Sequence, residues 1–184
     1  MPRPPKGPLL SRSTSQRAQS LVEFALSSVV LLLLVGGLVD IGRAIYISEG
    51  ISNAAREGAR HGAWYDAPRQ THPYLNDAAI QSVVDAELAT VGIPNSTLKT
   101  NGTSCPTPTD LNSFHNPPFA NSAYPSTANQ AWLYICYTSS SGPPPSTDLN
   151  VIVLYSYGPL TPLITAQFGL FHLASNVHMT VQGS

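Results

Sequence analysis

The 184-residue sequence predicts an α+β protein with a long N-terminal transmembrane helix, a second amphipathic helix and a small antiparallel sheet. Three observations favour this class: an uncharged apolar run near the N-terminus, one later segment with helical spacing of apolar residues, and three strand-like segments towards the C-terminus. We expect three parts: a basic leader at 1–18, the transmembrane helix with its extension at 19–63, and an exported domain at 64–184.

The composition argues against several kinds of function. Charged residues make up 10% of the chain and the formal net charge is -1, so we expect no nucleic-acid partner. Two cysteines are too few for a disulfide-dense mini-protein or a four-cysteine zinc site. The five histidines are scattered, and no nucleophile or phosphate-binding motif occurs. We therefore expect no catalytic residue, no metal and no cofactor, and a protein that is not an enzyme.

The apolar run is long enough to cross a bilayer. Residues 24–39 carry no charge and span about 24 Å as a helix, and residues 21–41 span about 31 Å. The longer range matches a hydrocarbon layer of roughly 30 Å, with Glu23 and Asp40 near its edges. A buried core helix would be long for this domain, and a secretory signal would not continue as a helix beyond Val39. We predict a single membrane span.

The distribution of charge predicts the orientation of this span. Because basic flanks stay in the cytoplasm, we expect the leader inside and the domain outside the cytoplasmic (inner) membrane. All ten acidic residues lie after the leader. The four basic residues that precede the first acidic one are Arg3, Lys6, Arg12 and Arg17.

The two cysteines fall in the exported part. Outside the cytoplasm a disulfide between Cys105 and Cys136 can persist. Closing that loop of about 31 residues would contribute roughly 3–4 kcal/mol by chain entropy. Two buried free thiols are the alternative.

Glu23 stands at the start of the apolar run, where an unpaired carboxylate costs a few kcal/mol unless it reaches the headgroups. The stretch from Arg17 to Phe24, RAQSLVEF, resembles a class III (type IV-like) prepilin processing site, with alanine in place of the usual glycine. The resemblance implies cleavage by a prepilin peptidase between Ala18 and Gln19. The new amine of Gln19 would pair with Glu23 of a neighbouring subunit, an attraction of about 4 kcal/mol before desolvation.

The resemblance continues along the helix. QSLVEF at 19–24, VDIGRA at 39–44 and SNAAREGAR at 52–60 resemble TadE-like proteins, minor pilins or pseudopilins of the tight-adherence (Flp-type) pilus system. VIV at 151–153, which leads to YGPLTP at 157–162, resembles the family's later strand-and-turn element. This implies a pilin-like fold and a role in assembly of an adhesion pilus. The implied partners are other pilins, the assembly machinery, a prepilin peptidase and the lipid bilayer. A membrane-anchored extracellular binding module is the alternative, and an anchored hydrolase is a third.

Small side chains form two neighbouring rows on the helix extension, each repeating every four residues. Such rows let a helix or a sheet approach closely. The approaching element is either a partner subunit or the chain's own domain, and the two readings are compatible. The rows are Ala54, Gly58 and Gly62, and beside them Ala55, Ala59 and Ala63.

The exported domain has one helix and several strands. Asn76 is a predicted N-cap for an amphipathic helix of about 15 residues that ends at Gly92 and Pro94. Residues 94–130 are expected to be a mobile loop because Pro, Gly, Asn, Ser and Thr dominate them. Of the expected strands, the second is apolar on both faces and therefore central. The strands are predicted at 132–138, 149–155 and 173–181.

Overall fold

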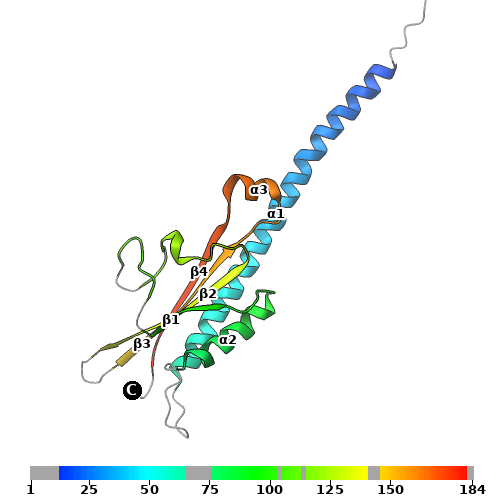
Figure 1. Cartoon of the computed structure of the whole chain (residues 1–184). Coiled ribbons are helices and arrows are strands. Elements are labelled where there is room, and N and C mark those ends of the chain that lie inside the picture. Colours follow the sequence, from blue (N-terminus) through cyan, green and yellow to red (C-terminus); the bar gives the residue numbers. More distant parts are fainter. Residues whose placement is uncertain (1–12, 65–75, 103–104, 113–114, 141–145, 182–184) are drawn as a thin grey trace, which may run out of the picture. The chain divides into compact units, whose positions relative to one another are not determined.

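The computed structural model describes residues 13–64, 76–102, 105–112, 115–140 and 146–181 (Figure 1). Most of the predicted leader lies outside these residues. The chain divides into two compact units, Met1–Val39 and Asp40–Ser184. They are described separately below.

The first unit consists of the N-terminal part of helix α1, which spans Ser13–Ala63. Its large apolar side chains, from Leu21 to Val39, are exposed. The helix is long and apolar enough to cross a membrane. Because exposed leucine and valine side chains need a cover other than water, α1 is a candidate membrane anchor.

Helix α2, Asp77–Thr90, begins and ends as the sequence predicts. The side chain of Asn76 accepts a hydrogen bond from the backbone N–H of Ala79 at 3.1 Å and so caps the first turn. Beyond the last turn, Gly92 adopts a φ of 75°, which favours glycine. Ile80, Val84 and Leu88 form the buried stripe.

The described residues form one four-stranded sheet of order β1-β2-β3-β4 (Figure 1). The pairs β2–β3 and β3–β4 are antiparallel, and β1 pairs with β2 in parallel. The α+β class is therefore confirmed, with β3 inside the sheet as predicted. The strands are β1 Thr97–Gly102, β2 Gln130–Ser140, β3 Ser146–Tyr157 and β4 Phe171–Thr180, with helix α3 at Pro162–Phe168 and a 3-10 turn at Asn121–Ala123.

The sheet differs from the prediction in one respect, because it is mixed rather than wholly antiparallel. Strand β1 lies within 94–130, the stretch expected to form a loop. Its sequence, TLKTNG, has little apolar alternation, so composition did not reveal it. As an edge strand it needs less apolar burial than β3 does, and its pairing with β2 supplies its backbone hydrogen bonds.

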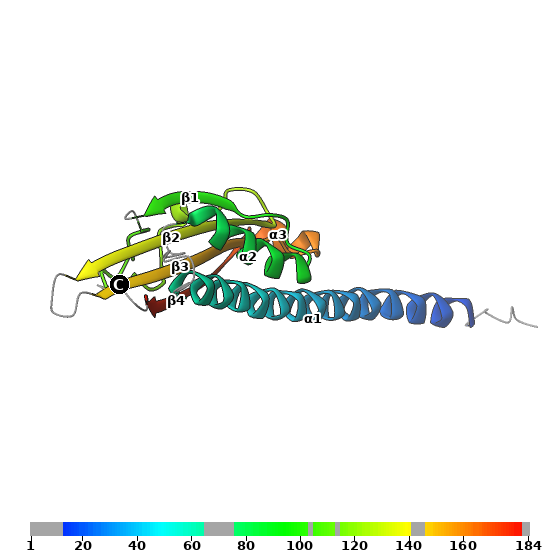
Figure 2. The ribbon, with the colours of Figure 1, turned by 90° about the horizontal axis from the view of Figure 1, so that it is seen from below.

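Both faces of β3 are covered. Helix α2 and the part of α1 that begins at Asp40 lie on one side of the sheet (Figure 2). Val151 and Val153 share a core cluster with residues of both helices on this side. Ile152 and Leu154 point to the opposite face, where Phe119 and Tyr124 from the segment before β2 cover them. The strand is apolar on both sides because neither side meets water.

The small residues of α1 make close packing possible inside the domain. Ala54, Ala55 and Ala59 are fully buried in the core. A β-carbon at Gly58 would lie 2.5 Å from a methyl of Val84, and one at Gly62 would meet Leu149 and Ile80. In the structure, the two rows are occupied by α2 and β3 of the same chain.

We predict that Gly58→Ala destabilises the domain by about 1–3 kcal/mol, since the added methyl would overlap the stiff side chain of Val84. Gly42→Ala is the matched control because a β-carbon there meets nothing within 4 Å. Alanine also favours a helix over glycine by about 1 kcal/mol. Thermal unfolding of the full-length protein in detergent should give a lower Tm for Gly58→Ala alone. Equal Tm values for the two variants would contradict the close approach.

Candidate functional site

Asp40 carries a buried carboxylate immediately after the apolar run of α1. The residue is 4% exposed. Its Oδ1 accepts the backbone N–H of Leu160 at 2.7 Å, and its Oδ2 accepts that of Thr161 at 3.0 Å. Hydrogen bonds to a charged acceptor are the stronger kind, and both carboxylate oxygens use them here.

Tyr157 completes this arrangement from the end of β3. Its hydroxyl lies 3.0 Å from the backbone carbonyl oxygen of Asp40 and 3.3 Å from Oδ1, so its proton has two acceptors on one residue. Burial raises the pKa of Tyr157, which keeps the hydroxyl protonated and able to donate. The guanidinium of Arg43 lies 5.3 Å from the centre of the same ring, within the range of a cation–π contact.

We call Asp40, Tyr157, Leu160 and Thr161 the Asp40 clasp. It joins two segments that lie about 120 residues apart in the chain. Both segments carry the motifs singled out in the sequence, VDIGRA and YGPLTP. The sequence placed Asp40 near the edge of the apolar run and did not predict its hydrogen-bond donors. The clasp itself has no sequence signal, because its donors are mostly backbone N–H groups that any residue supplies.

The predicted processing residues lie together on α1, in the first unit. Ala18, Gln19 and Glu23 are all exposed. The side-chain amide of Gln19 donates a hydrogen bond to Oε1 of Glu23 at 3.1 Å, one helical turn away. The exposed carboxylate of Glu23 can therefore accept a further partner. The buried carboxylate of Asp40, in the second unit, already has donors on both oxygens.

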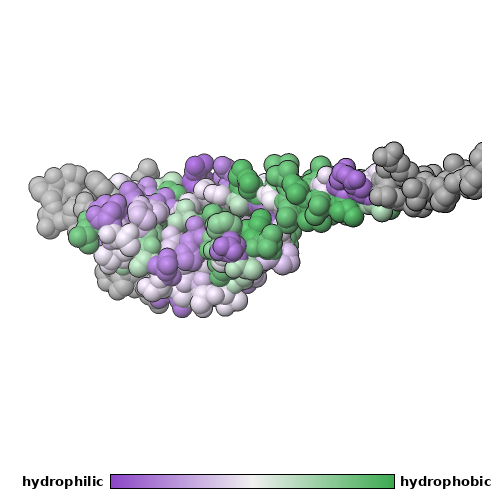
Figure 3. All heavy atoms as spheres, turned by 90° about the horizontal axis from the view of Figure 1, so that it is seen from above, coloured by the Kyte–Doolittle hydropathy of each residue, from purple (hydrophilic) through white to green (hydrophobic). Residues whose placement is uncertain are grey.

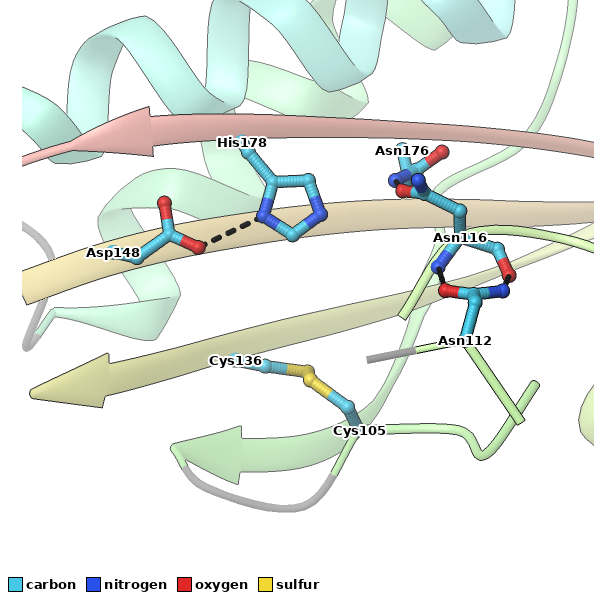
Figure 4. Close-up of polar contacts among 7 residues, drawn as sticks. All are labelled: Cys105, Asn112, Asn116, Cys136, Asp148, Asn176 and His178. Atoms are coloured by element: carbon cyan, nitrogen blue, oxygen red, sulfur yellow. Dashed lines mark hydrogen bonds and ion pairs between the residues drawn. A yellow bond between two sulfur atoms is a disulfide. The ribbon is translucent and has the colours of Figure 1, made fainter. Parts of the chain in front are cut away.

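On the far face of the sheet, Cys105 and Cys136 form a disulfide (Figure 4). It ties the segment that follows β1 to β2. A cysteine held in a disulfide has no thiolate to offer, so Cys105 is no nucleophile. Beside it, across β3 and β4, Nδ1 of His178 lies 2.8 Å from Oδ2 of Asp148.

Asparagine side chains hold the described part of 94–130 against β4 (Figure 4). Oδ1 of Asn112 accepts the backbone N–H of Asn116 at 3.0 Å. The side chain of Asn116 in turn accepts a hydrogen bond from the amide of Asn176. Together with the disulfide, these bonds anchor a segment whose composition predicted a loop.

The described residues contain no group of three or more His, Cys, Asp or Glu side chains that could hold a metal ion. A cavity of about 370 Å³ lies beside the disulfide, with Tyr134 and Pro106 among its walls. No charged side chain lines it. Its chemistry therefore specifies no particular ligand.

We predict that Asp40→Ala costs about 1–3 kcal/mol, because it leaves two backbone N–H groups without their acceptor. Amide hydrogen exchange of Leu160 and Thr161 in the full-length protein should become faster. Tyr157→Phe is the control: it removes the hydroxyl and keeps the carboxylate, so exchange at these two amides should stay slow. Similar exchange in both variants would show that the carboxylate does not hold the turn.

Comparison with known proteins finds a family match in the N-terminal part of the chain. A search of curated proteins and a search of solved structures found no match. Residues 18–60 match the family model described as TadE-like protein. The TadE-like resemblance predicted from the sequence is therefore confirmed over residues 18–60, which we call the TadE-like segment. The resemblance at 157–162 stays a prediction.

Proposed function

We propose that this chain is a membrane-anchored minor pilin or pseudopilin that takes part in assembly of a Flp-type adhesion pilus. The observation that carries the proposal is the TadE-like segment at 18–60, which coincides with the apolar helix α1. The segment begins at the proposed processing site and continues along α1 past Asp40. Its partners would be other pilins and the assembly machinery.

Two of the four acidic residues in the segment, Glu23 and Asp40, support different tasks. Asp40 is saturated by donors from its own chain, so it holds the domain together. Glu23 is exposed beside the apolar run and has the amide of Gln19 as a neutral partner. After cleavage before Gln19, the free amine of a neighbouring subunit would bring a positive charge to Glu23. Pairing these charges in a low-dielectric layer would fix the register between subunits.

The proposed location follows from charge and hydropathy. The chain would cross the cytoplasmic membrane once, with the basic leader inside and residues 64–184 outside. The disulfide between Cys105 and Cys136 is in keeping with an oxidising compartment. A prepilin peptidase acting at the cytoplasmic side would reach Ala18.

We predict that the protein isolated from membranes of its native host lacks residues 1–18. Intact-mass measurement checks this directly, because removal of the leader leaves Gln19 as the first residue. Ala18→Gly should be processed at least as completely, since glycine is the family's usual residue there. Substituting Ala18 by a bulky leucine should block cleavage. A full-length mass for the native sequence would favour the simple anchored module over the pilin.

We predict that Glu23→Ala inserts into the membrane as well as the native chain but impairs pilus assembly. Removing an unpaired carboxylate from the edge of an apolar run lowers the cost of insertion by a few kcal/mol. Glu23→Gln is the matched control for shape, because it keeps the hydrogen bonding and removes the charge, and it should impair assembly likewise. Membrane fractionation measures insertion, and counts of pili by electron microscopy measure assembly. Normal piliation in both variants would remove Glu23 from the mechanism.

A further inference from the structure

Exposed apolar side chains gather around α3, next to the Asp40 clasp. Leu163 is 58% and Phe168 is 69% exposed, and Leu160 and Phe171 are exposed as well. The sequence from 158 to 171 contains no charged residue. A turn between two strands is ordinarily polar because it faces water. We therefore expect the exposed apolar side chains of this turn to contact something other than water.

The clasp sets the level of this turn along α1. The backbone N–H groups of Leu160 and Thr161 bind the carboxylate of Asp40. Asp40 is the first residue after the uncharged run 24–39. The start of α3 is thus held within hydrogen-bonding distance of the point where the membrane-spanning sequence ends.

The exposed side of α1 changes character shortly beyond that point. Ile41, Ile45 and Tyr46 are exposed, and the next exposed residue along the helix is Glu49. Ile45 lies about 7.5 Å beyond Asp40 along the helix axis. This is close to the roughly 5–8 Å thickness of a headgroup layer. Tyrosine is enriched at that depth, because its ring is apolar and its hydroxyl is wet.

We propose that the α3 turn, residues 158–171, docks on the bilayer surface, with Leu163 and Phe168 inserted among the lipid headgroups. Figure 3 shows strongly hydrophobic residues along the apolar run of α1, and hydrophilic or neutral residues over most of the visible face of the domain. The exposed apolar side chains around α3 are an exception to this polar surface. We assign lipid as the occupant for the following reason. The backbone of Leu160 and Thr161 is bound to Asp40, and Asp40 directly follows the apolar run 24–39, which itself requires lipid. The opposite end of β3, near Asp148, carries charge instead.

Docking would give the domain a second attachment beside the helix. A single helix leaves a domain free to tilt, and a second apolar contact in the interface restricts that tilt. A subunit withdrawn from the bilayer would expose the same side chains. This inference rests on the membrane anchoring in the proposed function and not on the role in a pilus.

Tryptophan fluorescence in vesicles tests the docking. The full-length protein carrying Phe168→Trp, Trp64→Phe and Trp132→Phe has a single reporter on α3. The protein carrying Trp132→Phe alone keeps Trp64, which is 63% exposed and lies about 36 Å beyond Asp40 along α1. A third protein, with Leu31→Trp in the background without Trp64 and Trp132, reports insertion of the helix. All three are reconstituted at low protein density in vesicles of phosphatidylcholine brominated on its acyl chains.

The expected result is roughly threefold stronger quenching by brominated lipid at position 168 than at Trp64, with weaker quenching by aqueous iodide. Quenching of position 168 by iodide, at the level of Trp64, would place α3 in water and overturn the docking. Protection from both quenchers would mean that a second copy of the chain covers the patch, which also overturns it. Strong lipid quenching at position 31 in either case would leave the anchoring intact. Its absence would overturn the anchoring and the docking together.

Discussion

The interaction on which the domain depends is the hydrogen bonding of one buried carboxylate. Asp40 lies in α1 at the end of the apolar run, where the helix begins to pack in the folded domain. Burying its charge there would be costly without hydrogen-bond donors. Backbone N–H groups of Leu160 and Thr161 and the hydroxyl of Tyr157 supply them. The same bonds fix the end of β3 and the start of α3 on α1. The site that satisfies the charge therefore also determines where the domain begins.

Beyond Asp40, close packing decides which surfaces of α1 are available. Gly58 and the neighbouring alanines let α2 and β3 approach the helix so closely that a methyl group has no room. A face filled in this way has no space for a second helix. In the proposed pilin, contacts of α1 with other subunits would fall on the exposed apolar stretch up to Val39 and on the exposed side of the extension. Glu23, at the start of that stretch, is exposed, whereas Asp40 is buried, and the proposal gives the two carboxylates different tasks for that reason.

The described part of 94–130 shows how a segment poor in apolar residues becomes ordered. β1 gains order from parallel pairing with β2, and the disulfide between Cys105 and Cys136 closes the chain beside it. Asparagine side chains then connect the segment to β4. The strand pairing, the disulfide and the hydrogen bond between Asn116 and Asn176 all join residues far apart in the sequence. Each depends on strands that are already paired, so the order of this segment follows from the sheet rather than from its own composition.

The sequence by itself determined the features that depend on neighbouring residues. The apolar run, the capping of α2 by Asn76 and the double-sided apolar pattern of β3 are local patterns, and the structure bears each of them out. The TadE-like resemblance also lies in a continuous stretch. Only the tertiary structure decided the partners of Asp40, the parallel pairing of β1 and the use of the small-residue rows inside the domain. In each case the partner is distant in the chain. Backbone donors and small side chains can contact many different partners, so the local sequence does not predict which one they contact.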